Sequence, residues 1–304
     1  MSLLTPRSGR PRTSVNQPTR GYRVFQGING VILTGVVVVT LYPFVNIIAR
    51  SFSGERQIRA GEVTLWPKGF DLTTYRIVFT DDTFWRGYGN TVFYTVVSTA
   101  VAMVLTTCYA YVLSKKHLKG RGALVGIAVF TMFFSGGLIP NYVLITSLGL
   151  KNSVWAIALP NAISVFNLLV MKAFFESLPS ELEEAAEIDG LSTYGILLRI
   201  VLPLSKAVIA TMVLFYSVSF WNSWFQAFLY MDRADLMPVT VYLRNLIAGA
   251  TGATNAGATT EQGSQVAANI QAVTIVLTSL PILCVYPFVQ RYFVSGVMLG
   301  AVKG

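Results

Sequence analysis

The side chains of this sequence that could do chemistry gather between Lys172 and Lys206, where six of its 14 acidic residues lie. Carboxylates in such a run can bind the basic groups of a partner. The sequence lacks the residues for catalysis by histidine or zinc, because His117 is its only histidine and lies outside this stretch. The chain also lacks a Gly-x-x-x-x-Gly-Lys-Ser/Thr loop for nucleotide phosphates. We therefore expect no catalytic residue, no metal site and no enzymatic activity in this chain.

The spacing of residues in the acidic stretch predicts two short helices joined by a tight turn. Ser180 and Glu183 have the spacing of a capping box, in which each side chain satisfies a free backbone N–H at the start of a helix. The first helix is expected to cover residues 181–189. Its small and apolar side chains share one face, which holds Leu182, Ala185 and Ala186. Glu183 and Glu187 are expected to face solvent.

Gly190 follows this helix at a position where a left-handed backbone is expected, which glycine adopts without penalty. Ser192 can cap a second helix that runs from Thr193 to about Leu202 and stops at Pro203. On this geometry alone, an ordinary amphipathic hairpin at the protein surface is the simpler interpretation.

Most of the remaining chain is apolar. The sequence of 304 residues is 53% hydrophobic and 12% charged, whereas about 25% of residues are charged in an ordinary soluble domain. Six stretches lack Asp, Glu, Lys and Arg, and each is near or above the roughly 20 residues that a helix needs to cross a bilayer. They cover residues 28–48, 90–114, 123–146, 153–171, 207–231 and 268–290. Since backbone groups in lipid must bond within their own segment, we predict an all-α polytopic membrane protein with six transmembrane helices.

The distribution of basic residues predicts the orientation of these spans. Residues 1–27 contain five arginines and no acidic residue, and the short loop after the second span is also basic, with Lys115, Lys116, Lys119 and Arg121. Basic residues near span ends mark the cytoplasmic side. We therefore expect a cytoplasmic basic tail (1–27), a transmembrane domain (28–290), and a cytoplasmic C-terminal tail (291–304). The net charge of +9 is thus attributed to topology, and no nucleic acid is expected as a partner.

The predicted spans contain no ionisable acid or base that could relay protons, as proton-coupled pumps usually do. Energy for uphill transport is therefore expected to come from another subunit. In the fifth span, polar side chains recur at spacings of three and four and form one stripe: Tyr216, Ser219, Asn222, Ser223, Gln226 and Tyr230, with Trp221 and Trp224 beside it. Hydroxyl, amide and aromatic groups suit a sugar, but such residues also hold membrane helices together. Both interpretations are kept.

Three groups of residues in the acidic loop resemble the EAA motif in the membrane subunits of ATP-binding-cassette importers: Glu184, Ala185 and Ala186; Asp189 and Gly190; and Ile200, Leu202 and Pro203. The likeness extends over nearly the whole chain, through Asn90-Thr91 and residues 136–140, 287–293 and 300–304. These features are similar to the maltose-type sugar permease family, in particular to the six-span partner of its two permease subunits.

The resemblance implies a type I importer permease fold, in which the hairpin 172–206 is a coupling helix seated in a cytoplasmic ATPase. It implies a second homologous permease subunit, two ATP-binding-cassette ATPase subunits that carry ATP and magnesium, and an extracytoplasmic solute-binding protein that the loop 232–267 would reach. No cofactor is expected in this chain. The expected location is the bacterial cytoplasmic (inner) membrane, as a multi-pass protein with both termini in the cytoplasm.

The function implied by the resemblance is to form half of the translocation pathway for a sugar. An oligosaccharide is favoured, and acidic, alginate-like chains are included. A secondary transporter or channel for a small polar solute is the alternative. It would account for the spans and the polar stripe but not for the EAA residues.

Overall fold

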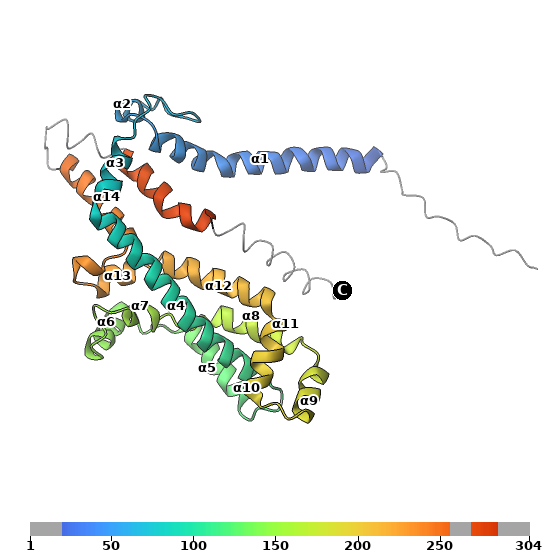
Figure 1. The fold of residues 1–304 in the computed structure, drawn as a ribbon. Coiled ribbons are helices and arrows are strands. Elements are labelled where there is room, and N and C mark those ends of the chain that lie inside the picture. Colours follow the sequence, from blue (N-terminus) through green and yellow to red (C-terminus); the bar gives the residue numbers. More distant parts are fainter. Residues whose placement is uncertain (1–19, 256–268, 285–304) are drawn as a thin grey trace, which may run out of the picture.

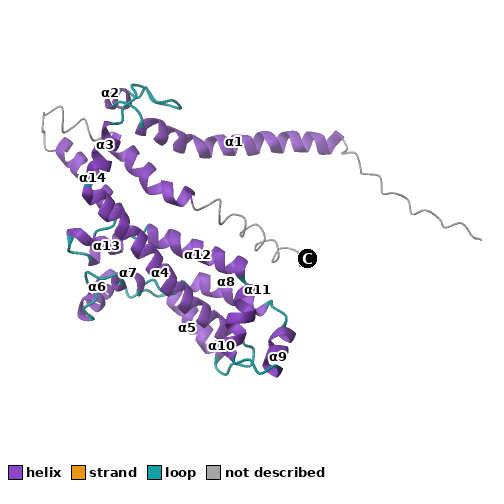
Figure 2. Cartoon of the chain, in the orientation of Figure 1, coloured by secondary structure: helices purple, strands orange, loops and turns teal. Residues whose placement is uncertain are grey.

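The computed structural model describes residues 20–255 and 269–284, which form helices joined by loops (Figure 2). Among these residues, the only pairing of extended backbone is an isolated bridge between Ser53 and Phe70. The predicted all-α class is therefore confirmed. Three segments with sequence-based expectations lie outside the described residues: most of the basic tail 1–27, loop residues 256–268, and the C-terminal part that includes 287–304.

The first half of the chain forms α1 (Arg20–Ser51), α2 (Glu55–Arg59), α3 (Thr73–Thr80), α4 (Asp82–Ser114), α5 (Arg121–Phe133), α6 (Leu138–Ser147) and α7 (Trp155–Ala158). The second half forms α8 (Val165–Glu176), α9 (Ser180–Ile188), α10 (Thr193–Ile196), the π-helical turn η1 (Leu197–Val201), α11 (Leu202–Leu204), α12 (Lys206–Trp221), α13 (Trp224–Tyr230), the 3₁₀ turn η2 (Ala234–Leu236) and α14 (Val239–Asn255). A last apolar helix covers Asn269–Cys284.

Two described helices are long and apolar enough to cross a membrane unbroken, Gly21–Ser51 and Asp82–Ser114, and the number rises to four if each strongly bent pair counts as one span. The third predicted stretch is one such pair, since α5 and α6 are bent by 113°. Gly137 lies in this break with φ of +87°, a conformation that favours glycine. The fourth and fifth stretches are also divided, into α7 and α8 and into α12 and α13. Three of the six predicted spans are therefore broken helices.

α4 is the axis of the packed region, running diagonally through it in Figure 1 and contacting α7, α8, α12 and α14. Its 33 residues contain no proline, so the usual cause of a sharp kink is absent. Small polar side chains are buried along it, namely Thr91, Thr95, Ser98, Thr99, Thr106 and Thr107. Such residues let neighbouring membrane helices approach closely. α4 is therefore the element against which the other helices of the packed region are placed.

α1 differs from α4 in its surroundings. It lies apart from the packed helices (Figure 1), and its side chains are exposed over residues 21–45. A helix that is apolar on all sides is stable when lipid or a partner surrounds it. This helix is thus a surface that the described chain leaves uncovered.

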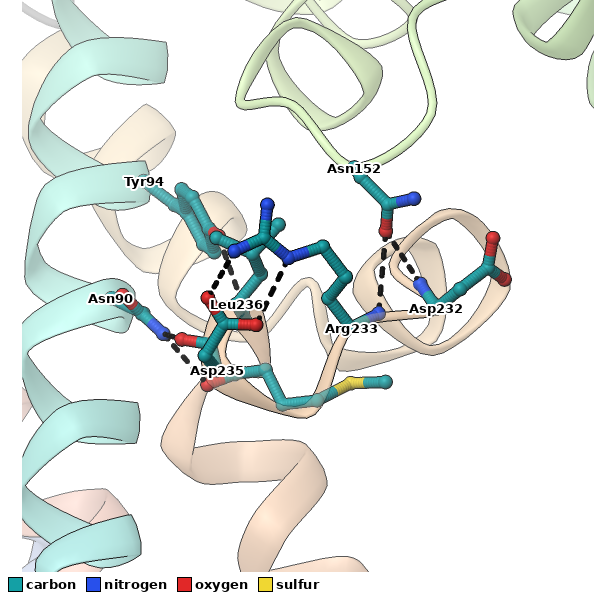
Figure 3. A network of polar contacts seen from close by, with 8 residues as sticks. Asn90, Tyr94, Asn152, Asp232, Arg233, Asp235 and Leu236 are labelled. Carbon is teal, nitrogen blue, oxygen red and sulfur yellow. Dashed lines mark hydrogen bonds and ion pairs between the residues drawn. The ribbon is translucent and has the colours of Figure 1, made fainter.

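The segment 231–238, called the latch segment below, is held against the amino end of α4 (Figure 3). The amide of Asn90 donates to the carbonyl oxygens of Asp235 and Met237 at 2.7 and 3.2 Å. The Tyr94 hydroxyl donates to the carbonyl oxygen of Leu236 at 2.8 Å. These bonds satisfy backbone carbonyls that a loop would otherwise expose to water. The conformation of the segment is thereby tied to two side chains of α4.

The other side of the latch segment is held by the turn before α7. Asn152, with a φ of +56°, accepts the backbone N–H groups of Asp232 and Arg233 at 2.7 and 3.3 Å (Figure 3). The Lys151 ammonium lies 2.8 Å from the Asp232 carboxylate. Its hydrogen bond holds the pKa of that carboxyl below its usual range. The latch segment is therefore fixed between α4 and a second loop.

Gly87 provides a test of this packing. A Cβ added there would lie 3.1 and 3.2 Å from the backbone N and Cα of Val239, whereas one added at Gly89 would meet nothing within 4 Å. We expect Gly87→Ala to cost about 1–3 kcal/mol, because backbone must move to make room. Gly89→Ala should be neutral or stabilising by up to about 1 kcal/mol, as alanine favours helix. Thermal unfolding of the purified subunit in detergent measures both; equal midpoints for the two variants would contradict the close approach.

Candidate functional site

The acidic stretch folds as a helical hairpin, residues 179–204, beyond the carboxyl end of α4 (Figure 1). Its first helix, α9, ends just before Gly190, which has φ of +80°. The second helix begins after Ser192, whose hydroxyl accepts the backbone N–H of Gly195 at 3.3 Å. The predicted left-handed glycine and the predicted serine cap are both confirmed.

The predicted capping box is wrong. Pro179 occupies the cap position, Ser180 is already helical, and no side chain caps the first turn. The Glu183 side chain reaches α4 instead, where it accepts a hydrogen bond from Tyr111 and pairs with Lys115. A charged partner competes successfully with a backbone N–H for this carboxylate.

The second helix does not stop at Pro203 as predicted, because α10, η1 and α11 together continue to Leu204. Within η1 the bonding widens to a π-type turn, in which the Leu202 N–H donates to the Leu197 carbonyl. Pro203 follows directly on this wider turn, as the second residue of α11, and has no N–H to donate to the preceding turn. The chain turns only after Ser205, where it bends by 86° into α12.

The faces of α9 also differ from the expectation. Ala186 is 5% exposed and packs with the core cluster beside α4, and Glu183 is half-buried. Leu182 and Ala185, expected on the packed face, are exposed. The ionic contact to α4 sets this rotation, because residues three apart share one face of a helix. The outward surface of the hairpin consequently includes large apolar side chains, with Ile188 88% and Tyr194 79% exposed.

The EAA-like residues separate into two sets. One set is exposed at the first helix and the turn and consists of Glu184, Ala185, Asp189 and Gly190. The other set faces the protein: Ala186 is buried, and Ile200 and Leu202 are half-buried against the same core cluster, while Pro203 is exposed. The structure therefore brings part of the motif to the surface and uses part of it to seat the hairpin.

A cleft of about 500 Å³ separates the hairpin from the basic loop after α4. Its lining includes basic side chains of the loop, Lys115, Lys116 and His117, and carboxylates of α8 and the hairpin, Glu176, Glu183, Glu184 and Glu187. Arg121 also pairs with Glu176, which pairs in addition with Lys172. The Lys115–Glu183 pair therefore joins the loop to the hairpin, and the Arg121–Glu176 pair joins it to α8.

The polar stripe predicted in the fifth span is not one continuous surface. Tyr216 is buried, sharing a hydrogen bond with Thr106 at 2.6 Å and accepting the backbone N–H of Ser164 at 2.9 Å. Trp221 is also buried and donates to the carbonyl oxygen of Thr278 at 3.0 Å. These two side chains hold helices together, as the alternative interpretation of the stripe had it.

The remainder of the stripe is divided by the break between α12 and α13. Asn222 and Ser223 lie in this break, and their side chains donate to carbonyl oxygens of their own helix. Asn222 is exposed and Gln226 half-buried. Ser219 is exposed one turn earlier and lines a cavity. The regular spacing of these residues could not predict the break. Because of it, the residues of the stripe do not share one face of a single helix.

The cavity that Ser219 lines has a volume of about 800 Å³ and lies between α12 and the break before α8. Its polar lining comes from both sides, namely Asn161, Ser164, Asn167, Tyr216 and Ser219, and its apolar lining includes Phe166 and Phe215. Asn167 is 5% exposed, so the protein encloses most of this residue while it lines the cavity. Sequence reasoning missed the three residues of the fourth stretch. Their spacing of three within a charge-free stretch was a signal that could have found them.

Residues 90–299 match the family described as binding-protein-dependent transport system inner membrane component. Protein LplC of Bacillus subtilis (strain 168) is 45% identical over 287 residues, which cover 94% of this chain and 97% of that protein. The polygalacturonan/rhamnogalacturonan transport system permease protein YtcP of the same organism is 42% identical over 270 residues, covering 88% and 94%.

A solved structure gives the same result. In the crystal structure of a bacterial ABC transporter involved in the import of the acidic polysaccharide alginate, one chain is 32% identical to this one with a TM-score of 0.80. The match covers 90% of this chain and 98% of that chain. The hairpin and the cavity both lie within residues 90–299, the part of the chain that the family model matches.

The family resemblance carried by the EAA-like residues is therefore confirmed by independent likenesses over most of the chain. Proteins of this family are transport subunits of the inner membrane and are not themselves catalytic. The chain belongs to the inner-membrane components of binding-protein-dependent transport systems, the permease subunits of ATP-binding-cassette importers of sugars.

Proposed function

We propose that this chain forms one half of the translocation pathway of an ATP-driven importer for an oligosaccharide. The observation that carries the substrate class is the uncharged polar lining of the cavity between α12 and α8. Amide and hydroxyl groups exchange hydrogen bonds with sugar hydroxyls, and the rings of Phe166 and Phe215 offer apolar faces to sugar C–H groups. A volume of about 800 Å³ is within the usual range for small-molecule sites.

The length and charge of the sugar are suggested by the relatives. One is named for polygalacturonan and rhamnogalacturonan transport, and a solved neighbour imports the acidic polysaccharide alginate. N–H and O–H donors such as those of Asn167 and Ser219 can bind a carboxylate as well as a hydroxyl group. Acidic oligosaccharides are therefore the first substrates to test.

The pathway proposal keeps the six residues that the sequence indicated: Tyr216, Ser219, Asn222, Ser223, Gln226 and Trp221. Ser219 would contact the sugar within the cavity, while Tyr216 and Trp221 would hold its walls. The other three would continue the polar path through the break at the end of α12. Asn161, Ser164 and Asn167 are added to them.

The hairpin is proposed as the coupling element for an ATPase subunit. The residues that would carry coupling are Glu184, Ala185, Ala186, Asp189, Gly190, Ile200, Leu202 and Pro203. Exposed Ile188 and Tyr194 beside the acidic side chains favour a partner groove with an apolar floor and a basic rim. Closure of two ATPases on ATP would then move the hairpin, and with it α8 and α12, as one rigid body.

The complete importer would contain a second homologous permease subunit, two ATPase subunits carrying ATP and magnesium, and an extracytoplasmic solute-binding protein. In the proposed orientation the hairpin and both tails, 1–27 and 291–304, are cytoplasmic, and the loop 232–267 faces the binding protein. The spans within 28–290 would lie in lipid. Family membership supports this function over a secondary transporter or channel.

If the cavity is part of the pathway, two variants of its lining should differ in what they lose, transport in one and stability in the other. Asn167→Leu keeps the side-chain volume but removes the amide, so sugar import by the reconstituted importer should fall by up to about tenfold, the equivalent of roughly 1.4 kcal/mol. Tyr216→Phe leaves Thr106 and the Ser164 N–H without a partner, so it should lower stability by about 1–3 kcal/mol. Uptake of labelled oligosaccharide and thermal unfolding separate the two effects. If the Asn167→Leu variant imports sugar at the wild-type rate, the cavity is not part of the pathway.

The coupling assignment predicts that Glu184→Lys abolishes ATP hydrolysis stimulated by the binding protein while membrane insertion is unchanged. Glu184 is exposed, so the charge reversal should weaken docking to the ATPase without unfolding the chain. Glu62→Lys is the control, since it makes the same charge change at an exposed position far in sequence from the hairpin. This variant should still co-purify with the ATPase. Normal stimulated hydrolysis by Glu184→Lys would overturn the assignment.

A further inference from the structure

α4 is the one long unbroken helix in the packed region that the structure describes. α5 and α6 are sharply bent, and α12 is bounded by a bend at Ser205 and by the break at Asn222. α1 is almost as long, with 32 residues, but its side chains are exposed over residues 21–45 and do not pack against the other helices there. A continuous helix without proline resists bending, because a bend strains its backbone hydrogen bonds. A displacement at one end of α4 is therefore passed to the other.

The amino end of α4 is attached to the latch segment 231–238. Besides the bonds from Asn90 and Tyr94 (Figure 3), the Thr91 hydroxyl accepts the Val239 N–H at 2.9 Å. Gly87 lets the backbone of Val239 come within contact distance of the helix. Side chains from two consecutive turns of α4 thus hydrogen-bond to backbone groups at the start of the loop 232–267, so a load on the loop acts on α4.

The carboxyl end of α4 is attached to α9. Lys115 pairs with Glu183, and the Tyr111 hydroxyl donates to the same carboxylate at 3.2 Å. The Lys115 ammonium also lies 4.1 Å from the centre of the Tyr111 ring, so the cation, the ring and the carboxylate form one closed group. Both ends of the ion pair are mostly shielded from solvent, which strengthens it relative to a surface pair. Glu183 is therefore engaged within the chain, beside the EAA-like residues.

We propose that α4 is a rigid tie that makes the latch segment and the coupling hairpin move together. Asn90 and Lys115 are about 37 Å apart along the helix at 1.5 Å per residue, enough to link the two faces of a membrane. Asn90, Tyr94, Tyr111 and Lys115 are positioning residues in this scheme. The proposal rests on the proposed function, because it identifies how a binding protein at one face acts on an ATPase at the other. By linkage, each partner then raises the affinity for the other.

The test uses the full importer in lipid nanodiscs with its two ATPases and its sugar-loaded binding protein. One variant, Asn90→Ala with Tyr94→Phe, releases the amino end; a second, Lys115→Met, releases the carboxyl end. Each should reduce the stimulation of ATP hydrolysis by the binding protein by about fivefold, within the usual range of allosteric coupling. Hydrogen exchange of residues 180–190 should likewise lose the added protection that the binding protein confers on the wild type.

Two comparisons distinguish a tie from general damage. Because the two ends act in series, combining both variants should reduce stimulation no further than either does alone, whereas independent lesions would add. Exchanging the pair, Lys115→Glu with Glu183→Lys, should restore at least part of the stimulation that Lys115→Met loses. Lys119→Met and Tyr88→Phe are matched controls, since neither side chain forms a polar contact with the residues that the structure describes, and both should behave as wild type.

The outcomes separate this proposal from the proposed function. If the wild-type complex is stimulated normally, two results would overturn the tie. One is that the losses of the two variants add up in the combined variant, and the other is that neither variant loses stimulation. Absence of stimulation by any sugar-loaded binding protein in the wild-type complex would instead overturn the proposed function. Reduced stimulation, no further loss on combination and rescue by the exchanged pair would together support the tie.

Discussion

A helix in an apolar surrounding must satisfy its own backbone hydrogen bonds, and α4 does so over 33 residues without interruption. Its buried threonines and serines allow α7, α8, α12 and α14 to pack closely around it. The broken helices of the neighbouring stretches are tolerable because they lie against this continuous one. Their breaks create the space between α12 and α8 in which a polar cavity forms. A rigid axis and interrupted neighbours are thus two parts of one arrangement.

The position of the hairpin also depends on α4. Its position is set by the contact of Glu183 with Lys115 and Tyr111 at the end of α4 and by the apolar seat of Ala186, Ile200 and Leu202. That contact turns Leu182 and Ala185 outward with the acidic residues. The exposed surface is then suited to a partner that offers both apolar and basic groups. Such a surface is what the proposed docking of an ATPase subunit requires.

Sequence reasoning predicted the fold class, the left-handed Gly190 and the cap at Ser192, because these depend on local chemistry and composition. It failed where a tertiary contact overrode a local one. Glu183 was assigned to a capping box, yet it pairs with Lys115, which lies 68 residues earlier in the chain. The helical spacing of the polar stripe was correct up to Trp221, but a break there places Tyr216, Ser219 and Asn222 in different surroundings. Asn167 was missed because its importance depends on a cavity that only the packed helices create.

We expect this permease to move an oligosaccharide only when its partner subunits hydrolyse ATP. Proteoliposomes that contain both permease subunits and the ATPases, with ATP inside and the binding protein and labelled acidic oligosaccharide outside, test it most directly. Uptake should require both ATP and the binding protein and should be unaffected when ion gradients are dissipated. Uptake that continues without ATP, or that follows an ion gradient, would contradict it.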